Sequence, residues 1–277
     1  RRLKPPPLLA ASASTSMLIP IRAAPRPSLR FWPVVQRNLL VWRKLAIPSI
    51  VGNIAEPLIT LVAFGYGLGS LIGDVQGLPY IQFLASGSIA VSCVLAATFE
   101  ALYSAYSRMQ VQKTWDSIMN APIALDDIVF AEMLWAAMKS LFSVAAIMLV
   151  LVALGISRAP TLIVALPVLG FVGITFASIA LVFNALAQGY DFFTYYFTLV
   201  ITPMTFLSGV YFPIEQMPDW LQAVAAALPL TAAVELVRPL VIGEWPADVA
   251  RPMATLAAYA VGGYYVALVL TRRRFYR

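Results

Sequence analysis

Long apolar stretches, separated by short polar segments, run along most of the chain. A helix needs roughly 20 apolar residues to cross the hydrocarbon core of a bilayer, and six stretches have about that length. The six stretches are Ile50–Ile72, Ile81–Tyr106, Ile128–Gly155, Leu162–Ala187, Phe192–Phe212 and Met253–Leu270. This pattern predicts an all-α integral membrane protein with six transmembrane helices.

Residues 31–47, which precede the first stretch, have a different pattern. Leu40 and Trp42 alternate with basic side chains such as Arg43. This is typical of an amphipathic helix that lies in the membrane interface with its cations at the headgroups. A cytoplasmic extension of the first span is the alternative, but Pro48 favours a break and therefore the interfacial helix.

The segment between the fifth and sixth stretches, 213–252, is too long for a turn and too apolar for a soluble loop. Its uncharged part, Leu221–Val234, is too short to cross the membrane and is broken by Pro229. Trp220 and Trp245 flank it as interfacial anchors do. We expect a re-entrant helical pair on the outer side, with a helical cap on the outer surface as the alternative.

The first 30 residues contain clustered prolines and an Ala/Ser run that cannot form one helix. Their apolar parts are too short for the core of a signal peptide. We expect a disordered extension over 1–30, with Met17 as an alternative start, and one transmembrane domain over 31–277.

Composition supports the membrane class and excludes several kinds of site. Apolar residues make up 61% of the chain and charged residues 12%, and the mean hydropathy is +0.82. A soluble domain typically has about twice this charged fraction. The sequence has no histidine, which excludes zinc sites with histidine ligands and Ser/His nucleophile pairs. It also has no GxxxxGK[ST] loop, so we do not expect an enzyme that hydrolyses nucleotides by that route.

Basic residues are distributed unequally between the two sides that six alternating spans would create. The side opposite the termini receives only Arg158, Arg238 and Arg251. The remaining Lys and Arg residues, apart from Lys139 within the third stretch, fall on the side of the termini. Cytoplasmic segments carry an excess of Lys and Arg, so both termini are expected to be cytoplasmic. The net charge of +6 therefore follows a membrane rule and does not indicate nucleic-acid binding.

Four charged residues fall within the predicted spans: Glu56, Glu100, Glu132 and Lys139. Charges at such positions are costly and are usually paired or functional. Spans two and three run antiparallel through a short loop, so we expect Lys139 to pair with Glu100, or otherwise with Glu56. A structural ion pair near the cytoplasmic end and a polar or proton-coupled pathway are the two interpretations.

The block Ser107–Val129 between spans two and three is amphipathic and begins with basic residues. We interpret it as a cytoplasmic docking segment over 107–127, with a short helix in Gln110–Asn120. Trp115, Ile118 and Met119 are spaced three and four apart, so one helix face would carry them as apolar anchors for a partner. The candidate coupling residues are Arg108, Gln112, Lys113, Trp115, Asp116, Ile118, Met119, Asn120 and Pro122.

Aromatic residues gather at both ends of the fifth stretch. An interfacial belt explains most of them, and a surface for stacking carbohydrate is the alternative. Candidate pathway or re-entrant residues are Phe206, Tyr211, Phe212 and Glu235.

Two segments carry a resemblance to a known family. They read ATFEALYSAYSRMQVQKTWDSIMNAPIALDDIVFAEMLWAAMKS over Ala97–Ser140 and FLSGVYFPIEQMPDWLQAVAAALPLTAAVELVRPLVIGE over Phe206–Glu244. With them, the chain from about Trp32 to its C-terminus resembles the permease subunits of type-2 ABC exporters, and the first segment narrows the resemblance to the nodulation type.

The resemblance implies a multi-pass protein of the bacterial inner membrane. It implies a homodimer that pairs with two copies of a separate ATPase, similar to nodulation protein I, which binds ATP and Mg; this chain would bind no cofactor. It also implies export of an amphipathic lipo-chitooligosaccharide. Hydrophobic drugs or another lipid or polysaccharide are alternative substrates, and an ATP-independent transporter or channel is the alternative of another class.

Overall fold

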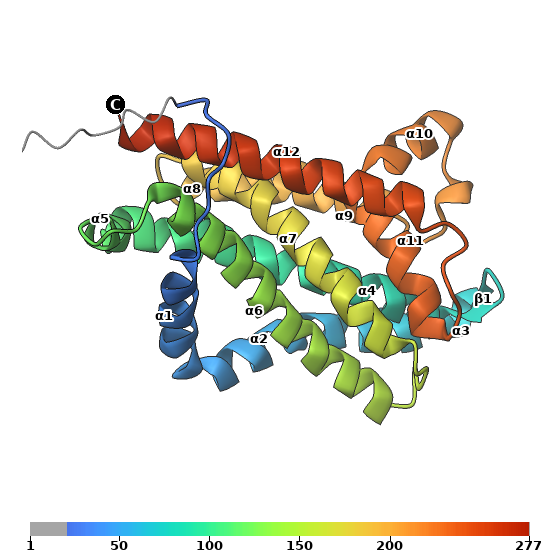
Figure 1. The fold of residues 1–277 in the computed structure, drawn as a ribbon. Helices are drawn as coiled ribbons and strands as arrows, with labels where there is room; N and C mark the ends of the chain where they lie inside the picture. The colour runs from blue at the N-terminus through green and yellow to red at the C-terminus, as the bar shows by residue number, and fades with distance from the viewer. Residues whose placement is uncertain (1–20, 277) are drawn as a thin grey trace, which may run out of the picture.

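The computed structural model describes residues 21–276 (Figure 1). These residues form helices, the segments that connect them and two short strands. The α-helices are α1 (Phe31–Arg43), α2 (Ala46–Thr60), α3 (Gly69–Ile72), α4 (Tyr80–Phe99), α5 (Thr114–Met119), α6 (Leu125–Ala153), α7 (Leu162–Leu186), α8 (Asp191–Tyr196), α9 (Thr202–Leu207), α10 (Asp219–Ala227), α11 (Pro229–Ile242) and α12 (Ala250–Phe275). The π-helical segments are Leu61–Leu68, Glu100–Ser104, Ser107–Val111 and Phe197–Ile201, and Ile214–Gln216 is a 3₁₀ turn. The first 20 residues, which include Met17, lie outside the described part.

Five helices in the described part are long and apolar enough to cross a membrane. They are Ala46–Ile72, Tyr80–Val111, Leu125–Ala153, Leu162–Leu186 and Ala250–Phe275. They coincide with five of the six predicted spans. The other predicted span, 192–212, is a shorter continuous helical run from Asp191 to Leu207, made of segments of 6, 5 and 6 residues.

The centre of the bundle is α7, which carries no charge and packs against α4, α6, α11 and α12. Small residues allow the close approach of these helices. A Cβ on Gly173 would lie 3.1 Å from Cα of Ala137 on α6, and one on Gly263 of α12 would lie 3.2 Å from the backbone of Ser178 on α7. This is how membrane helices commonly pack, since lipid provides no hydrophobic driving force between them.

The predicted N-terminal helix is present as α1, which ends at Arg43 and is separated from α2 by a short break. It lies across one end of the bundle (Figure 1) and packs on α6. Val34 and Val35 contact Ala131 and Trp135 in a small apolar cluster of their own. The break favours a separate helix over a straight extension of the first span.

The opposite end of the bundle is built from the segment between the last two spans. Helices α10 and α11 meet at an angle of 85° around Leu228 and Pro229, as expected for a broken or re-entrant pair. Beside them, β1 (Asp74–Val75) and β2 (Leu78–Pro79) form a two-stranded antiparallel hairpin with Val75 opposite Leu78.

Residues 21–30 are placed against the bundle, so the expected disordered extension over 1–30 is wrong for this part. Ser28 donates its hydroxyl to Asp127 at 3.0 Å, and Arg26 N–H donates to Asp126 at 3.1 Å. Arg272 of α12 donates to Asp126 and to the carbonyl of Ala23. We call residues 21–30 the N-terminal strap, because they join the end of α12 to the start of α6 (Figure 1).

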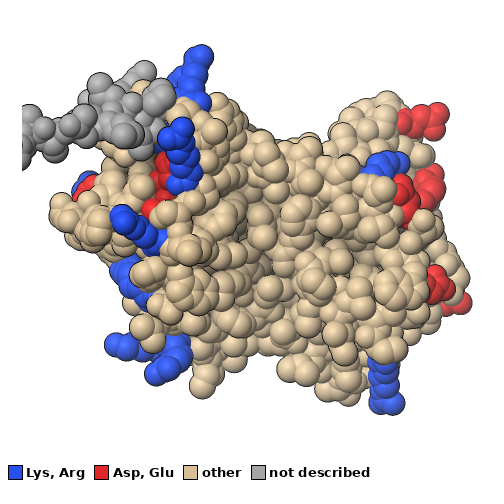
Figure 2. Space-filling view, viewed as in Figure 1, with Lys and Arg blue, Asp and Glu red and all other residues tan. Residues whose placement is uncertain are grey.

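Charged side chains gather at the two ends of the molecule, with a broad band of other residues between them (Figure 2). Most Lys and Arg lie at the end that holds α1, α5 and the C-terminus, and most Asp and Glu on this face lie at the end that holds α10 and the hairpin. We refer to these as the basic end and the acidic end.

Candidate functional site

A buried polar network lies at the basic end, and local helix geometry positions its members. Glu100 begins one π-helical turn and Arg108 lies in the next. Such wide turns are rare and frequently occur at functional sites. The carbonyls of Ala101 and Leu102 in the first turn accept hydrogen bonds from the Asn184 amide at 2.8 and 3.1 Å. Neighbouring α7 therefore holds the wide turn in place.

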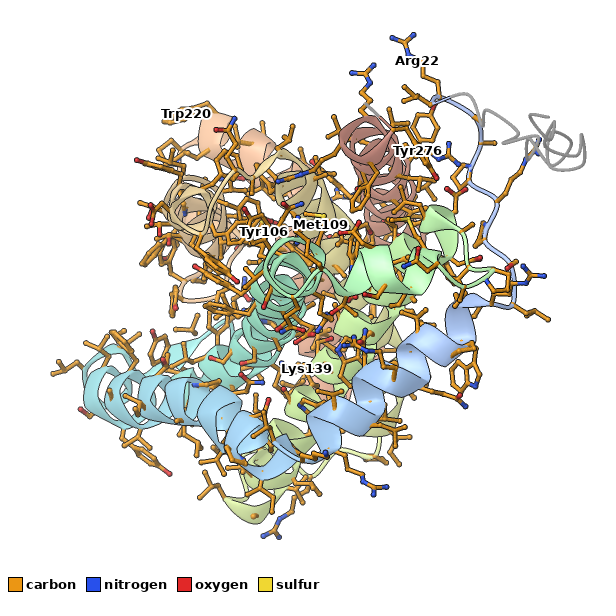
Figure 3. The ribbon with its side chains drawn as sticks, turned by 90° about the vertical axis from the view of Figure 1, so that its left-hand side faces the viewer. Arg22, Tyr106, Met109, Lys139, Trp220 and Tyr276 are labelled. Carbon is orange, nitrogen blue, oxygen red and sulfur yellow. The ribbon has the colours of Figure 1, made fainter. Side chains whose placement is uncertain are left out.

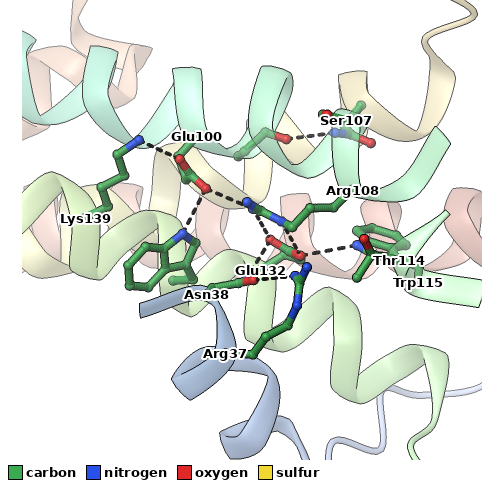
Figure 4. A network of polar contacts seen from close by, with 12 residues as sticks. Arg37, Asn38, Glu100, Ser107, Arg108, Thr114, Trp115, Glu132 and Lys139 are labelled. Atoms are coloured by element: carbon green, nitrogen blue, oxygen red, sulfur yellow. Dashed lines mark hydrogen bonds and ion pairs between the residues drawn. The ribbon is translucent and has the colours of Figure 1, made fainter. Parts of the chain in front are cut away.

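Glu100 accepts hydrogen bonds from three side chains (Figure 4). Lys139 Nζ lies 2.7 Å from Oε2, and Trp135 Nε1 and Arg108 Nη2 lie 2.8 and 2.9 Å from Oε1. Lys139 and Trp135 are one turn apart on α6. The predicted pairing of Lys139 with Glu100 is confirmed.

Glu132 is the second acceptor of the network (Figure 4). Arg108 donates to it through both Nε, at 2.9 Å, and Nη2. Trp115 Nε1 of α5 lies 3.2 Å from Oε1, and Asn38 Nδ2 of α1 lies 3.4 Å from Oε2. Glu132 therefore joins α1, α5 and α6, while Arg108 joins Glu132 to Glu100.

The network is close to electrically balanced. Glu100 and Glu132 are 3% and 1% exposed, and their charges match those of Arg108 and Lys139. Buried charges are tolerated when they are paired and hydrogen-bonded in this way. Arg37 of α1 adds a cation at the edge, and burial together with nearby Arg108 lowers its pKa. Between residues 21 and 276 no group of acidic or cysteine side chains could hold a metal ion.

A cavity of about 450 Å³ opens between α1, α6 and the two π-helical segments that follow α4, with Tyr190, just before α8, at its edge. The network forms one of its walls. Its polar wall includes Arg37, Lys139 and Gln112, and its aromatic wall includes Trp42 and Tyr190. In Figure 3, which faces the basic end, Lys139 lies within the bundle. The buried indole N–H of Trp42 has no hydrogen-bond partner among the described residues. The cavity thus combines aromatic surface with charged and neutral donors.

The docking segment has a different orientation from the one that its spacing suggested. Trp115 is 1% exposed and stacks on Phe275 at 6.0 Å, while Ile118 and Met119 pack against the apolar core. The expectation that Trp115 is a surface anchor for a partner is therefore wrong, because this apolar face binds α5 to its own domain. Arg108 also points inward. The exposed residues of the predicted set are Gln112, Lys113, Asp116, Asn120 and Pro122.

The remaining predicted site residues do not join the network. The side chain of Glu56 lies outside the described part of the structure. Phe206 and Tyr211 are at the other end, with ring centroids 5.3 Å apart, and Phe212 is partly exposed nearby. Glu235 forms an exposed ion pair with Arg251 at 3.1 Å. The structure therefore divides the candidate residues between the two ends of the bundle.

The sequence interpretation missed two features of the basic end. The first is the direction of Arg108, which the sequence places on the docking surface. The π-helical turns that direct its side chain inward leave no recognisable pattern in the sequence. The ion pair between Arg272 and Asp126 joins residues 146 positions apart and fixes the start of α6 to the end of α12. The acidic pair at 126–127, beside a predicted helix start, was the available signal for it.

Comparisons with known proteins agree with this architecture. Residues 30–242 match the model of the family described as ABC-2 type transporter. "Nodulation protein J" of Sinorhizobium fredii is 43% identical over 241 residues, which are 87% of this chain and 92% of that protein. "Nodulation protein J" of Rhizobium leguminosarum bv. trifolii is 43% identical over 257 residues, 93% of this chain and 98% of that protein. "Inner membrane transport permease YadH" of Escherichia coli is 23% identical over 242 residues, 86% of this chain and 91% of that protein. The chain belongs to the ABC-2 type transporter family.

Proposed function

We propose that this chain is the permease subunit of an exporter that moves an amphipathic, lipo-oligosaccharide-like substrate across the bacterial inner membrane. Membership of the ABC-2 family and the relatives named nodulation protein J support this proposal. ATP and Mg bind to a separate ATPase subunit, similar to nodulation protein I, which supplies the energy. The basic end, with both termini, faces the cytoplasm and the ATPase, in line with the excess of cations there (Figure 2).

The observation that carries the proposal is an unbroken chain of contacts from α5 to the cavity. Trp115 donates to Glu132, Arg108 bridges Glu132 and Glu100, and Lys139 pairs with Glu100 and lines the cavity. A push on α5 by the ATPase would therefore change the contacts between α4 and α6 beside the cavity. Hydrogen-bond and ion-pair networks of this kind are one of the physical routes that carry coupling between two sites.

The chemistry of the cavity fits an amphipathic molecule. An acyl chain can lie along Trp42, Tyr103 and Tyr190, and a polar headgroup can bond with Arg37 and Gln112. Pockets for such ligands commonly combine apolar walls with a few placed polar groups. The cavity opens beside α1, and we propose that α1 lies in the inner membrane interface, where the substrate would enter.

We further propose that two copies of the chain form the transport path. The helical run from Asp191 to Leu207 is too short to span a hydrocarbon core of roughly 30 Å by itself. It nevertheless exposes large apolar side chains, including Tyr195, Leu199 and Phe206. The irregular backbone that flanks so short a run would lie at membrane depth, where it is tolerated only against protein or a water-filled cavity. A second copy packed on this face would supply that cover.

Assembly with the ATPase tests the cytoplasmic interface directly. Asp116 and Ser117 are exposed on the outer face of α5, so Asp116→Arg should abolish co-purification of a co-expressed ATPase subunit through charge and size. Asp219→Arg, an equally exposed change on α10 at the other end, is the matched control and should leave assembly intact. If both variants assemble like the unchanged protein, α5 does not contact the ATPase.

Transport assays separate the candidate substrates. Inverted membrane vesicles that contain the permease and the ATPase should accumulate a lipo-chitooligosaccharide when ATP is supplied. ATP-driven uptake of a hydrophobic dye alone would favour the drug-exporter alternative. Uptake that proceeds without ATP, driven by a proton gradient, would contradict the ABC mechanism.

A further inference from the structure

A second cavity, of about 440 Å³, lies at the acidic end between α11, the β1–β2 hairpin and the turn after α9. It is far from the network described above, since it belongs to the other end of the bundle (Figure 1). Its polar lining includes Gln76, Ser208, Glu215, Thr231, Glu235 and Arg238. Three features of this lining indicate what it can bind.

The first feature is a guanidinium that is fixed but has no ion-pair partner. Arg238 of α11 donates to Ser86 Oγ at 3.0 Å and to the carbonyl of Gly209 at 2.6 Å, and it lies 3.8 Å above the ring of Phe83. Within the described part of the chain, no carboxylate forms an ion pair with it. Arg238 is thus a rigid donor at the cavity wall, with hydrogen-bonding capacity beyond these two bonds.

The second feature is a pair of hydroxyls without partners. Ser208 and Thr231 are almost completely buried, and neither Ser208 Oγ nor Thr231 Oγ1 makes a hydrogen bond in the described structure. Buried polar groups are nearly always satisfied, so each exception requires an explanation. Since both residues line the cavity, an occupant with its own hydroxyls or carbonyls would satisfy them.

The third feature is the excess of negative charge in the cavity lining. Glu215, Glu235 and Glu244 also line the cavity, against the single cation Arg238. Glu235 is paired with Arg251, and Glu215 accepts a hydrogen bond from Gln76 at 3.1 Å. Carboxylates at this density repel an anionic ligand but accept hydrogen bonds from neutral hydroxyls.

We propose that this cavity binds the saccharide part of the exported substrate at the outer end of the path, and that it selects neutral over anionic sugars. This inference rests on the proposed export function and assigns it an outer binding site. A neutral saccharide offers hydroxyls that donate to the carboxylates and oxygens that accept from Arg238, Ser208 and Thr231. Its apolar ring faces can lie against Val234 and Pro239 of the same wall.

Binding to the full chain in lipid nanodiscs tests the charge selectivity. The probes are chitotetraose, which is neutral, and tetragalacturonate, which has the same number of rings but a carboxylate on each. Titration should give a dissociation constant for chitotetraose at least about tenfold lower than that for tetragalacturonate, since each like charge opposes binding. Glu244→Gln should reduce the difference between the dissociation constants of the two probes, because it removes one like charge. Equal affinities, tighter binding of the anionic probe, or no binding of either would overturn the proposal.

A substitution that leaves packing unchanged locates the site. Thr231→Val replaces a hydroxyl without a partner by a methyl group, so it should not reduce stability, but it should weaken chitotetraose binding about threefold to tenfold. Thr98→Val is the matched control, because Thr98 is equally buried and its hydroxyl also lacks a partner, but it does not line this cavity. If both variants bind like the unchanged protein, the saccharide site is not here.

The two proposals fail in different ways. Co-purification of the ATPase and ATP-driven export by the unchanged protein, without saccharide binding in nanodiscs, would reject the outer site and leave the export function standing. Loss of ATPase assembly together with chitotetraose binding that Thr231→Val weakens would reject the export mechanism and keep the site.

Discussion

Glu100 connects the network at the level of single residues, because it accepts bonds from Lys139, Trp135 and Arg108. The pairing with Lys139 could be predicted, since two antiparallel spans with a short loop bring those positions to the same depth. The hydrogen bond between Arg108 and Glu100 could not be predicted. It depends on two π-helical turns, and no apolar periodicity in the sequence distinguishes these from a regular helix.

Lys139→Met should destabilise the protein by leaving the buried carboxylate of Glu100 with one cation fewer. Breaking a buried pair from one side costs roughly 3–5 kcal/mol, and the cost here should be near the lower limit, because Lys139 is partly exposed and Arg108 remains. Adding Glu100→Gln should recover part of the loss. Thermal unfolding in detergent compares the stabilities of the unchanged protein, the Lys139→Met variant and the double variant.

The exposed pair Arg251–Glu235 provides the control for that comparison. Arg251→Met removes the same kind of contact where the side chains are 61% and 38% exposed, so the cost should be below about 1 kcal/mol. A Lys139→Met variant as stable as Arg251→Met would show that the buried pair contributes little. A double variant no better than Lys139→Met would mean that Glu100 does not need this partner.

Trp115→Phe should separate assembly from coupling. Phenylalanine can keep the stacking on Phe275 but cannot donate to Glu132, which removes the first link from α5 to the network. The variant should still bind the ATPase, while ATP-driven transport in vesicles should fall severalfold. Trp220→Phe, an exposed change at the acidic end, should have no effect. Unchanged transport by Trp115→Phe would exclude this hydrogen bond from the coupling route.

At the scale of elements, the sequence was most informative where the pattern is long and periodic. Five spans and the broken pair α10–α11 follow from apolar length and from Pro229. The three-four spacing on α5 correctly identified an apolar face, but spacing alone does not reveal whether that face meets a partner or the protein's own core. The N-terminal strap could not be predicted, because it has no periodicity and is held by contacts with residues about 100 positions away.

The strap is expected to open when its acceptor is removed. Asp127 accepts bonds from the backbone N–H and the hydroxyl of Ser28, so Asp127→Ala should increase trypsin cleavage after Arg22 and Arg30 in membranes exposed on the cytoplasmic side. Loss of bonds to a charged acceptor, about 1.5–3 kcal/mol each, should accelerate local opening at least about tenfold. Mass spectrometry of the released peptides measures the rate.

Two further variants show which contacts set the rate of trypsin cleavage in the strap. Ser28→Ala removes only the hydroxyl bond and should give an intermediate cleavage rate. Asp116→Ala changes an exposed acid on the same side of the bundle and should leave the rate unchanged. If all three variants are cleaved at the rate of the unchanged protein, Asp127 does not hold the strap.

At the scale of the whole molecule, the two ends have different chemistry. The basic end carries the N-terminal strap, the end of α12, α5 and the network, and the acidic end carries the bent pair and the hairpin (Figures 1 and 2). The excess of cations on one side was readable from the sequence once the spans were known. The division of the candidate residues into two cavities was not, because it depends on how helices distant in the sequence pack together.

The orientation can be tested with single cysteines, since Cys93 is the only native cysteine and is fully buried. In a Cys93→Ala background, Asp219→Cys on α10 should react with a membrane-impermeant maleimide in intact spheroplasts if the acidic end faces outward, as proposed. Ser117→Cys on α5 should react only after the membrane is permeabilised. The unchanged protein should remain unlabelled under both conditions, which confirms that neither treatment unfolds it. Labelling of Ser117→Cys in intact spheroplasts would place the basic end outside, where no cytoplasmic ATPase could reach α5.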